Sequence, residues 1–109
     1  MAMVTGRFSI FLVRLDPAAG AETGKTRPCL IVSPDELNRA LATVIIAPMT
    51  TVRRGWPTRV AVTFQGKTGE IALDQIRTVD KVRLVKRLGD LDSETADVVL
   101  DTLGELFAP

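Results

Sequence analysis

Turns that carry Gly and Pro divide the sequence into short segments rich in β-branched and large apolar residues. Such segments are typical of β-strands. We expect strands at residues 7–15, 28–33, 43–49, 58–64 and 70–76, and a last strand over residues 85–91. The stretch QGKTG, between the fourth and fifth of them, should close a hairpin. Several short strands in succession, followed by a closing helix, predict a small and strongly curved barrel with helical additions.

A short helix should interrupt the strands after the second of them. In the sequence SPDEL, Ser33 can cap the helix, Pro34 suits the first helical position, and Glu36 completes a capping box. This helix should end before the next strand begins at Thr43.

A longer amphipathic helix should close the chain. Asp92 or Ser93 is expected to cap it, because side-chain oxygens at this position accept hydrogen bonds from free backbone N–H groups. Its apolar face, at helical spacing, would consist of Ala96, Val99, Leu100, Leu103, Leu106 and Phe107. The whole chain, residues 1–109, is expected to form one mainly β domain.

Composition excludes several classes of protein. The apolar runs are too short to cross a bilayer, and the N-terminus lacks the apolar core and cleavage site of a signal peptide, so we expect a soluble, cytoplasmic protein that does not bind membranes. The chain has no histidine and one cysteine, Cys29, which is expected to be a small buried apolar residue. A zinc site, a histidine-dependent triad and an internal disulfide are therefore not available, and we expect neither a metal nor a cofactor.

The net charge of +1 hides a strong asymmetry along the chain. Residues 1–87 contain all fourteen Lys and Arg against seven Asp and Glu, a net charge of +7, whereas residues 88–109 contain six acidic residues and no basic one. A scattered basic surface with a solvated acidic helix would give the same distribution. The alternative is that the basic part carries a site for a polyanion.

The sequence GKTRPCLIVSPDELNR places Arg27 directly ahead of a buried strand. Arginine is always ionised and presents a rigid fork of donors, so near apolar surface it usually meets an anion. A structural role, in which Arg27 ties its loop to a carboxylate or to carbonyl groups, is the alternative.

Three stretches of the chain, FLVRLDPAAGAETGKTRPCLIVSPDELNR, VIIAPMT and GEIALDQIRTVDKVRLVKRLGDL, resemble in order and spacing the MazF/PemK/Kid toxins of bacterial toxin–antitoxin pairs. The resemblance implies an SH3-like small β-barrel of the CcdB/Kid/MazF type, a homodimer, and a sequence-specific mRNA interferase that cuts single-stranded RNA without a metal. It also implies a cognate acidic antitoxin, MazE-like, with a disordered segment. The family's catalytic arginine and threonine match Arg27 in TRP and Thr50 in PMT.

Such chemistry uses the substrate's own 2′-hydroxyl as the nucleophile and, as the family resemblance implies, leaves a 2′,3′-cyclic phosphate and a 5′-hydroxyl. Arg27 can stabilise the charge that develops on the phosphorane oxygens, and Thr50 can bond the scissile phosphate or orient the hydroxyl. Only carboxylates remain as a general base, and the candidates are Glu22 and Asp74. Asp74 and its neighbour Gln75, which could also bind substrate, are expected in a strand, where a structural role is as strong an interpretation.

RNA-binding residues are expected in the loops that flank Arg27 and Thr50. Guanidinium and indole groups stack on exposed bases, although a lone tryptophan before a proline is as often a packed loop anchor. The candidates are Lys25, Thr51, Arg53, Arg54 and Trp56.

The chain departs from the family pattern at three positions. Ser9 stands where many relatives carry an acidic residue, and Ala21 and Ala72 stand where some plasmid-borne relatives have a catalytic histidine and arginine. The mechanism of those relatives should therefore not be transferred to this chain. Two other functions remain open from sequence: a non-catalytic inhibitor of DNA gyrase, as in CcdB-like toxins, and an inactive homologue that binds an antitoxin.

Overall fold

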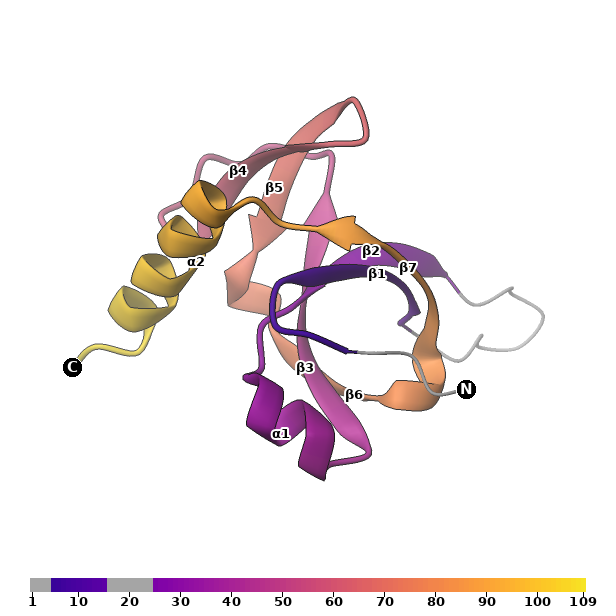
Figure 1. Ribbon diagram of the computed structural model, residues 1–109. Helices are drawn as coiled ribbons and strands as arrows, with labels where there is room; N and C mark the ends of the chain where they lie inside the picture. The colour runs from indigo at the N-terminus through magenta and orange to yellow at the C-terminus, as the bar shows by residue number, and fades with distance from the viewer. Residues whose placement is uncertain (1–4, 16–24) are drawn as a thin grey trace.

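The computed structural model describes residues 5–15 and 25–109, and it is mainly β (Figure 1). In chain order the elements are β1 (Ser9–Arg14), β2 (Thr26–Ile31), α1 (Asp35–Ala40), β3 (Thr43–Thr50), β4 (Arg59–Phe64), β5 (Lys67–Ala72), a 3-10 turn (Leu73–Gln75), β6 (Arg77–Asp80), a second 3-10 turn (Lys81–Arg83), β7 (Leu84–Asp90) and α2 (Ser93–Leu106). The predicted succession of strands and the C-terminal helix are confirmed. β6 was not predicted, and the strand expected over 70–76 lies instead at Lys67–Ala72.

The sheet curls because β3 has different partners along its length. The strand order is β4-β5-β3-β2-β1-β7, all neighbours are antiparallel, and β6 pairs with β3 outside this path. β3 pairs with β6 over Thr43–Ile46, with β2 over Ile46–Pro48, and with β5 at Met49 and Thr50. The β4–β5 hairpin therefore continues the sheet in a new direction and forms a separate lobe of the curl (Figure 1).

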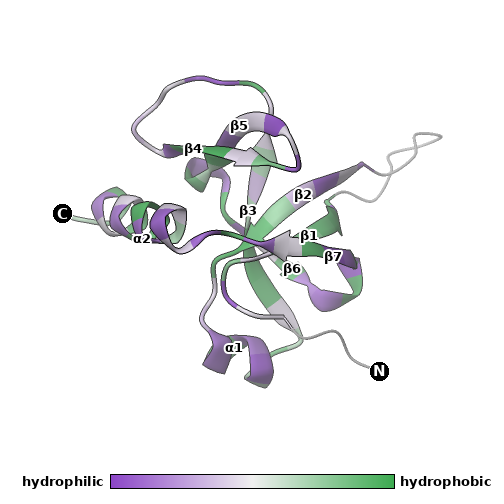
Figure 2. Ribbon diagram, turned by 45° about the horizontal axis from the view of Figure 1, so that its top comes forward, coloured by the Kyte–Doolittle hydropathy of each residue, from purple (hydrophilic) through white to green (hydrophobic). Residues whose placement is uncertain are grey.

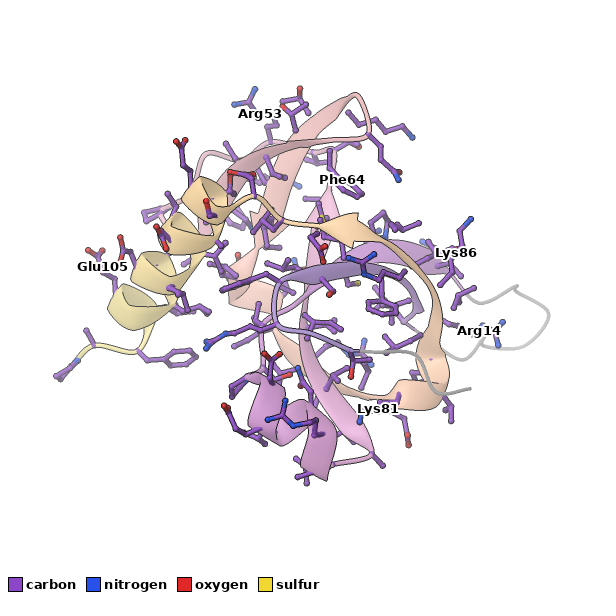
Figure 3. All side chains as sticks on the ribbon, in the orientation of Figure 1. Arg14, Arg53, Phe64, Lys81, Lys86 and Glu105 are labelled. Carbon is purple, nitrogen blue, oxygen red and sulfur yellow. The ribbon has the colours of Figure 1, made fainter. Side chains whose placement is uncertain are left out.

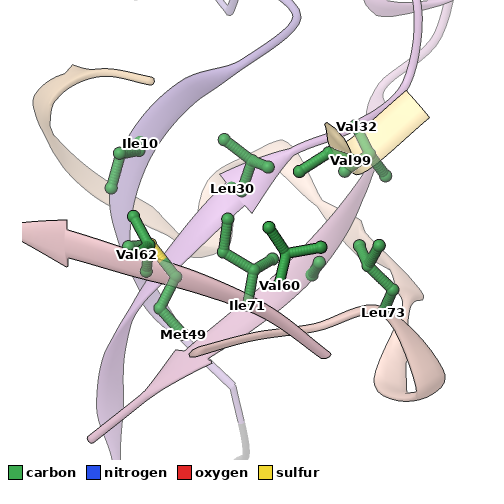
Figure 4. Packing of buried hydrophobic residues seen from close by; sticks show 10 residues of the cluster. Ile10, Leu30, Val32, Met49, Val60, Val62, Ile71, Leu73 and Val99 are labelled. Atoms are coloured by element: carbon green, nitrogen blue, oxygen red, sulfur yellow. The ribbon is translucent and has the colours of Figure 1, made fainter. Parts of the chain in front are cut away.

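Two apolar clusters lie on opposite faces of β1, β2 and β3, because side chains alternate along a strand. The first cluster joins these strands to the β4–β5 hairpin and α2, and Figure 4 shows its side chains packed between the strands. It comprises Ile10, Leu30, Val32, Ala47, Met49, Val60, Val62, Ile71, Leu73 and Val99. The second cluster lies inside the curl made by β1, β2, β3, β6 and β7, and comprises Phe11, Val13, Cys29, Ile31, Val44, Ile46, Val79 and Leu84. Figure 2 shows the apolar colour concentrated in the central strands and the polar colour on α1 and the outer loops.

The start of α1 differs from the expectation. Pro34 is the N-cap and no side chain caps the helix. The Ser33 hydroxyl instead donates to Asn38 Oδ1 at 2.5 Å and accepts from the Ile45 N–H at 3.0 Å. The predicted capping box is therefore wrong, because buried Asn38 and the backbone of β3 occupy the hydroxyl that would have capped the helix.

The C-terminal helix is capped as predicted by Asp92, whose carboxylate accepts from the Thr95 N–H at 3.0 Å. Its apolar face is only partly covered. Val99 is fully buried, whereas Leu100 is 38% and Phe107 70% exposed. The predicted face exists, and Leu103 also packs against the first cluster, but the C-terminal end of the helix extends past the barrel (Figure 1). Among the described residues, no helix has the length and apolarity needed to span a membrane.

Candidate functional site

Arg27 and Thr50 lie just beyond the end of the β2–β3 ladder. The register pairs Cys29 with Pro48, so continuing it by two residues places Arg27 opposite Thr50. The ladder stops before this point because β3 turns away to pair with β5, where Thr50 faces Glu70. By strand alternation, Arg27 lies on the face of β2 that carries Cys29 and the second cluster. Both residues predicted to be catalytic therefore lie at the same end of the ladder, and their catalytic role stays a prediction.

Positive charge accumulates at this end of the second cluster. Burial raises the pKa of the Cys29 thiol to about 12, while the guanidinium charges of Arg27 and Arg77 act in the opposite direction. Both arginines are therefore close enough to Cys29 to affect it electrostatically. Cys29 itself is fully buried, as predicted. Among the residues that the structure describes, Arg27 has no carboxylate partner.

The Thr50 side chain is held at the start of the loop that follows β3. Its hydroxyl oxygen accepts from the Val52 N–H at 3.1 Å, which leaves the hydroxyl proton to donate elsewhere. The backbone of Thr50 is in close contact with Gly69 of β5. A Cβ on Gly69 of β5 would lie 2.1 Å from the Thr50 carbonyl oxygen, so only glycine permits this approach of β5 to β3.

Glu70, which the sequence analysis did not nominate, holds the loop over residues 51–58. It is 4% exposed, and its two carboxylate oxygens accept from the N–H groups of Arg54 and Gly55, each at 2.9 Å. Glu70 Oε1 also lies 3.5 Å from Arg59 Nη1. The two backbone hydrogen bonds, from Arg54 and then Gly55, lower the pKa of Glu70, and the charge of Arg59 lowers it further. The only signal in the sequence was an isolated acidic residue within the apolar stretch GEIAL.

Arg59 connects Asp74 to the same loop. Its Nε donates to Asp74 Oδ1 at 2.7 Å and its Nη2 to Asp74 Oδ2 at 3.3 Å, while the Thr58 hydroxyl donates to Oδ1 at 3.0 Å. The Arg59 guanidinium also lies over the ring of Trp56, 4.6 Å from its centroid. The hydrogen bond from Arg59 is the main cause that lowers the pKa of Asp74.

Asp74 and Gln75 lie in the 3-10 turn after β5, so their predicted position in a strand is wrong. β5 ends at Ala72, where Leu73 turns into the first cluster and the backbone leaves the ladder. Gln75 is exposed. Glu22, the other candidate base, lies outside the described residues.

The predicted RNA-binding residues are all on the surface. Lys25 is exposed directly before β2, and residues 51–57 are exposed throughout. Arg53 points away from the barrel (Figure 3). Trp56 is 48% exposed, with Arg54 5.7 Å and Arg59 4.6 Å from its ring centroid. It is therefore both a loop anchor against Arg59 and an accessible aromatic surface. Within residues 5–15 and 25–109, no group of three or more His, Cys, Asp or Glu side chains could hold a metal ion.

Comparisons with known proteins agree on one family. Residues 6–107 match the family described as "PemK-like, MazF-like toxin of type II toxin-antitoxin system". The chain is 34% identical over 107 residues to Endoribonuclease EndoA of Bacillus subtilis (strain 168), covering 93% of this chain and 92% of that protein. It is 38% identical over 107 residues to Endoribonuclease PemK of Escherichia coli, covering 93% of this chain and 80% of that protein.

Solved structures show the same fold. A structure titled "Endoribonuclease in complex with its cognate antitoxin from Mycobacterial species" superposes with a TM-score of 0.80 at 31% identity, covering 96% of this chain and 97% of that chain. The predicted CcdB/Kid/MazF type of barrel is thereby confirmed.

Proposed function

Because the chain belongs to the PemK-like, MazF-like toxins of type II toxin–antitoxin systems, we propose that it is a sequence-specific endoribonuclease that cuts single-stranded RNA. The observation that carries this proposal is the position of Arg27 and Thr50 two residues beyond the last pair of the β2–β3 ladder, Cys29 with Pro48, where a continued register would set them opposite each other. The two named endoribonucleases that the chain matches over most of its length support the same activity.

In the proposed reaction the 2′-oxygen of the substrate attacks the adjacent phosphorus, and the bond from phosphorus to the 5′-oxygen breaks. The 2′-hydroxyl loses its proton and the leaving 5′-oxygen gains one, which gives a 2′,3′-cyclic phosphate and a 5′-hydroxyl. Arg27 donates two parallel hydrogen bonds to the non-bridging oxygens, where negative charge grows in the transition state. The Thr50 hydroxyl donates a hydrogen bond to the same phosphate and holds that phosphate in position for in-line attack.

Asp74 fits the role of general base less well than the sequence suggested. Its carboxylate is engaged by Arg59 and Thr58, and its lowered pKa makes it a weaker proton acceptor. Asp74 and Glu70 instead act together on the loop over residues 51–58. Glu22 remains the other carboxylate candidate for this step.

The loop over residues 51–58 is proposed to bind RNA beside the scissile phosphate. Arg53 and Arg54 supply positive charge for the backbone, and the exposed face of Trp56 offers a surface for base stacking. Lys25 and Thr51 extend this surface on either side of Arg27 and Thr50. Glu70 would keep the loop in one conformation, so that ordering it costs little when RNA binds.

The proposed partners follow from the family. The active form is a homodimer, and the natural inhibitor is a cognate, acidic, MazE-like antitoxin whose disordered segment covers the basic RNA surface. A related endoribonuclease has been solved in complex with its cognate antitoxin. An acidic segment and RNA phosphates would compete for the same arginines.

Cleavage of a mixed single-stranded RNA in the presence of EDTA tests the proposal. We expect cutting at a defined sequence, and no cutting where deoxyribose replaces the ribose upstream of that bond, because the nucleophile is then absent. Cleavage of the deoxy-substituted bond would contradict the mechanism. No RNA cleavage at all, with inhibition of DNA gyrase, would instead identify a CcdB-like inhibitor, and binding of an antitoxin alone would identify an inactive homologue.

A further inference from the structure

A pocket of about 210 Å³ opens directly beside Thr50, between the ends of β2 and β3 and the β4–β5 hairpin. Met49, Val62 and Phe64 provide apolar lining, and Thr50 itself forms part of the wall. The Phe64 ring points from the hairpin toward the barrel (Figure 3). The volume is below the roughly 300–1,000 Å³ typical of pockets for drug-sized ligands. It suits one flat ring system better than a larger ligand.

Polar side chains converge on the same pocket from the hairpin. Gln65, Lys67 and Thr68 line it, together with Thr51 from the start of the loop. An apolar lining with a few polar groups at its rim is the usual composition of a site that encloses a ring and reads its edge.

Gln65 occupies a backbone conformation that glutamine rarely adopts. The hairpin has a two-residue turn, Gln65–Gly66, between the paired residues Phe64 and Lys67, with φ angles of 51° and 76°. Positive φ at both central residues is the type I′ geometry, which strongly favours Asn, Asp or Gly at the first position. A residue kept in a sparsely populated conformation points to a function for its side chain. Here that side chain lines the pocket beside Thr50.

We propose that this pocket binds the base of a nucleotide next to the scissile phosphate, and that the amide of Gln65 reads the edge of that base. The inference rests on the proposed endoribonuclease function and adds a specificity site to it. A glutamine amide offers a donor and an acceptor side by side. Each base presents donors and acceptors in its own order, so an amide held in one orientation selects among them. Lys67 contributes positive charge toward the neighbouring phosphate.

The position of the pocket makes this occupant preferable to an unrelated small molecule. Thr50 belongs both to the pocket wall and to the residues proposed to hold the scissile phosphate. A nucleotide whose phosphate meets Thr50 therefore has the pocket within the reach of its own base. Bases of single-stranded RNA are free to turn into such a pocket.

The test compares Gln65→Gly with a matched change at the neighbouring turn position, Gly66→Asn. A glycine in place of Gln65 would suit the type I′ turn and remove the amide, so we expect a melting temperature equal to or a few degrees above that of the wild type. Gly66 has nothing within 4 Å of where a Cβ would lie, so Gly66→Asn perturbs the same turn without entering the pocket. The cleavage profile of each protein is determined on a randomised single-stranded RNA library. Binding is measured in parallel with a randomised 2′-fluoro RNA library, which lacks the nucleophile and is not cut.

In Gln65→Gly, we expect the preference for one base over the others at one position adjacent to the cut to fall at least ten-fold, in both cleavage and binding. Gly66→Asn should retain this preference. Lys67→Gln should weaken binding of all sequences and reduce its salt dependence. Unchanged base preferences in folded Gln65→Gly would overturn the inference and leave the endoribonuclease function intact. A wild-type protein that does not cut RNA would contradict the proposed function. Binding to the 2′-fluoro RNA library would still decide whether Gln65 selects a base.

Discussion

Gly69→Ala should disable the site by displacing the backbone of Thr50. The added Cβ would lie 2.1 Å from the Thr50 carbonyl oxygen, 3.0 Å from the Thr50 carbonyl carbon and 3.1 Å from the Thr51 Cα. Ordinary van der Waals contact begins at 3.4 Å, so the carbonyl oxygen must recede by about 1.3 Å, the difference between 3.4 and 2.1 Å. The obstructing atoms belong to the backbone and cannot rotate away. β3 and β5 must therefore separate where Thr50 pairs with Glu70.

A displacement of about 1 Å in a positioning group can cost about 10²-fold in rate, so we expect the single-turnover cleavage rate of Gly69→Ala to fall by about 100-fold. Overpacking of this kind costs about 1–3 kcal/mol, and each kcal/mol lowers Tm by about 4–8 °C in a domain of this size. The variant should thus fold and bind RNA while reacting slowly. Rate and Tm are measured on the same preparation below the melting transition.

Gly104→Ala is the matched control, because it makes the same chemical change in α2, where nothing lies within 4 Å of the new Cβ. Replacing glycine by alanine within a helix stabilises by about 0.5–1 kcal/mol, so its Tm should rise and its cleavage rate should not change. A folded Gly69→Ala protein that cuts at the wild-type rate would refute the reasoning, since it would show that the approach of β5 does not position Thr50.

Three further outcomes follow from the site. Arg27→Ala should keep Tm within a few degrees while the single-turnover rate falls by about 10²–10³-fold, as when one oxyanion donor is removed, and Arg27→Lys should restore little; early melting with a normal rate in the folded fraction would mean that Arg27 is a structural clamp. Glu70 and Asp74 have lowered pKa values in the folded protein, so the stability they contribute is present above the ordinary carboxyl pKa and is lost as the pH falls through their folded values. The difference in Tm between wild type and Glu70→Gln should therefore narrow as the pH is lowered from 7 to 3. A constant difference would show that the Glu70 carboxylate does not stabilise the loop over residues 51–58. The pKa of about 12 at Cys29 predicts that its thiol resists alkylation in the native protein at pH 8 and reacts after unfolding; rapid labelling of the native protein would show that Cys29 is accessible.

Local patterns in the sequence were sufficient for the order of the elements but not for the roles of individual polar residues. Strand positions depend on apolar alternation and turn chemistry, which are local, and these predictions held for β1 to β4 and for α2. Ser33 looked like a helix cap because nothing local indicates that Asn38 and the backbone of β3 compete for its hydroxyl. Competition between distant partners is a tertiary property.

In the candidate site, too, residues in local motifs were predicted, whereas the contacts of residues with distant partners were not. Arg27 and Thr50 were found through motifs that resemble a family, whereas Glu70 was missed because its two hydrogen bonds join backbone groups fifteen and sixteen residues away. Asp74 was placed in a strand since its neighbours are apolar, yet its bonds to Arg59 and Thr58 form across the turn that ends β5. No role for Gln65 was predicted from the sequence, because the feature that distinguishes it is a backbone φ angle of 51°.

The pairing of β1 with β7 has a consequence for how the chain is made. β1 joins residues separated by most of the chain, from Ser9 with Asp90 to Val13 with Leu84. At synthesis rates of about 5–20 residues per second, the ribosome needs roughly 4–15 s to proceed from the end of β1 to the end of β7. During that interval one edge of β1 has no native partner, and its free N–H and C=O groups can pair with other chains. Closure of the curl is a long-range step that must come late, so an incomplete nascent chain carries Arg27 and Thr50 before it has the finished barrel that surrounds them.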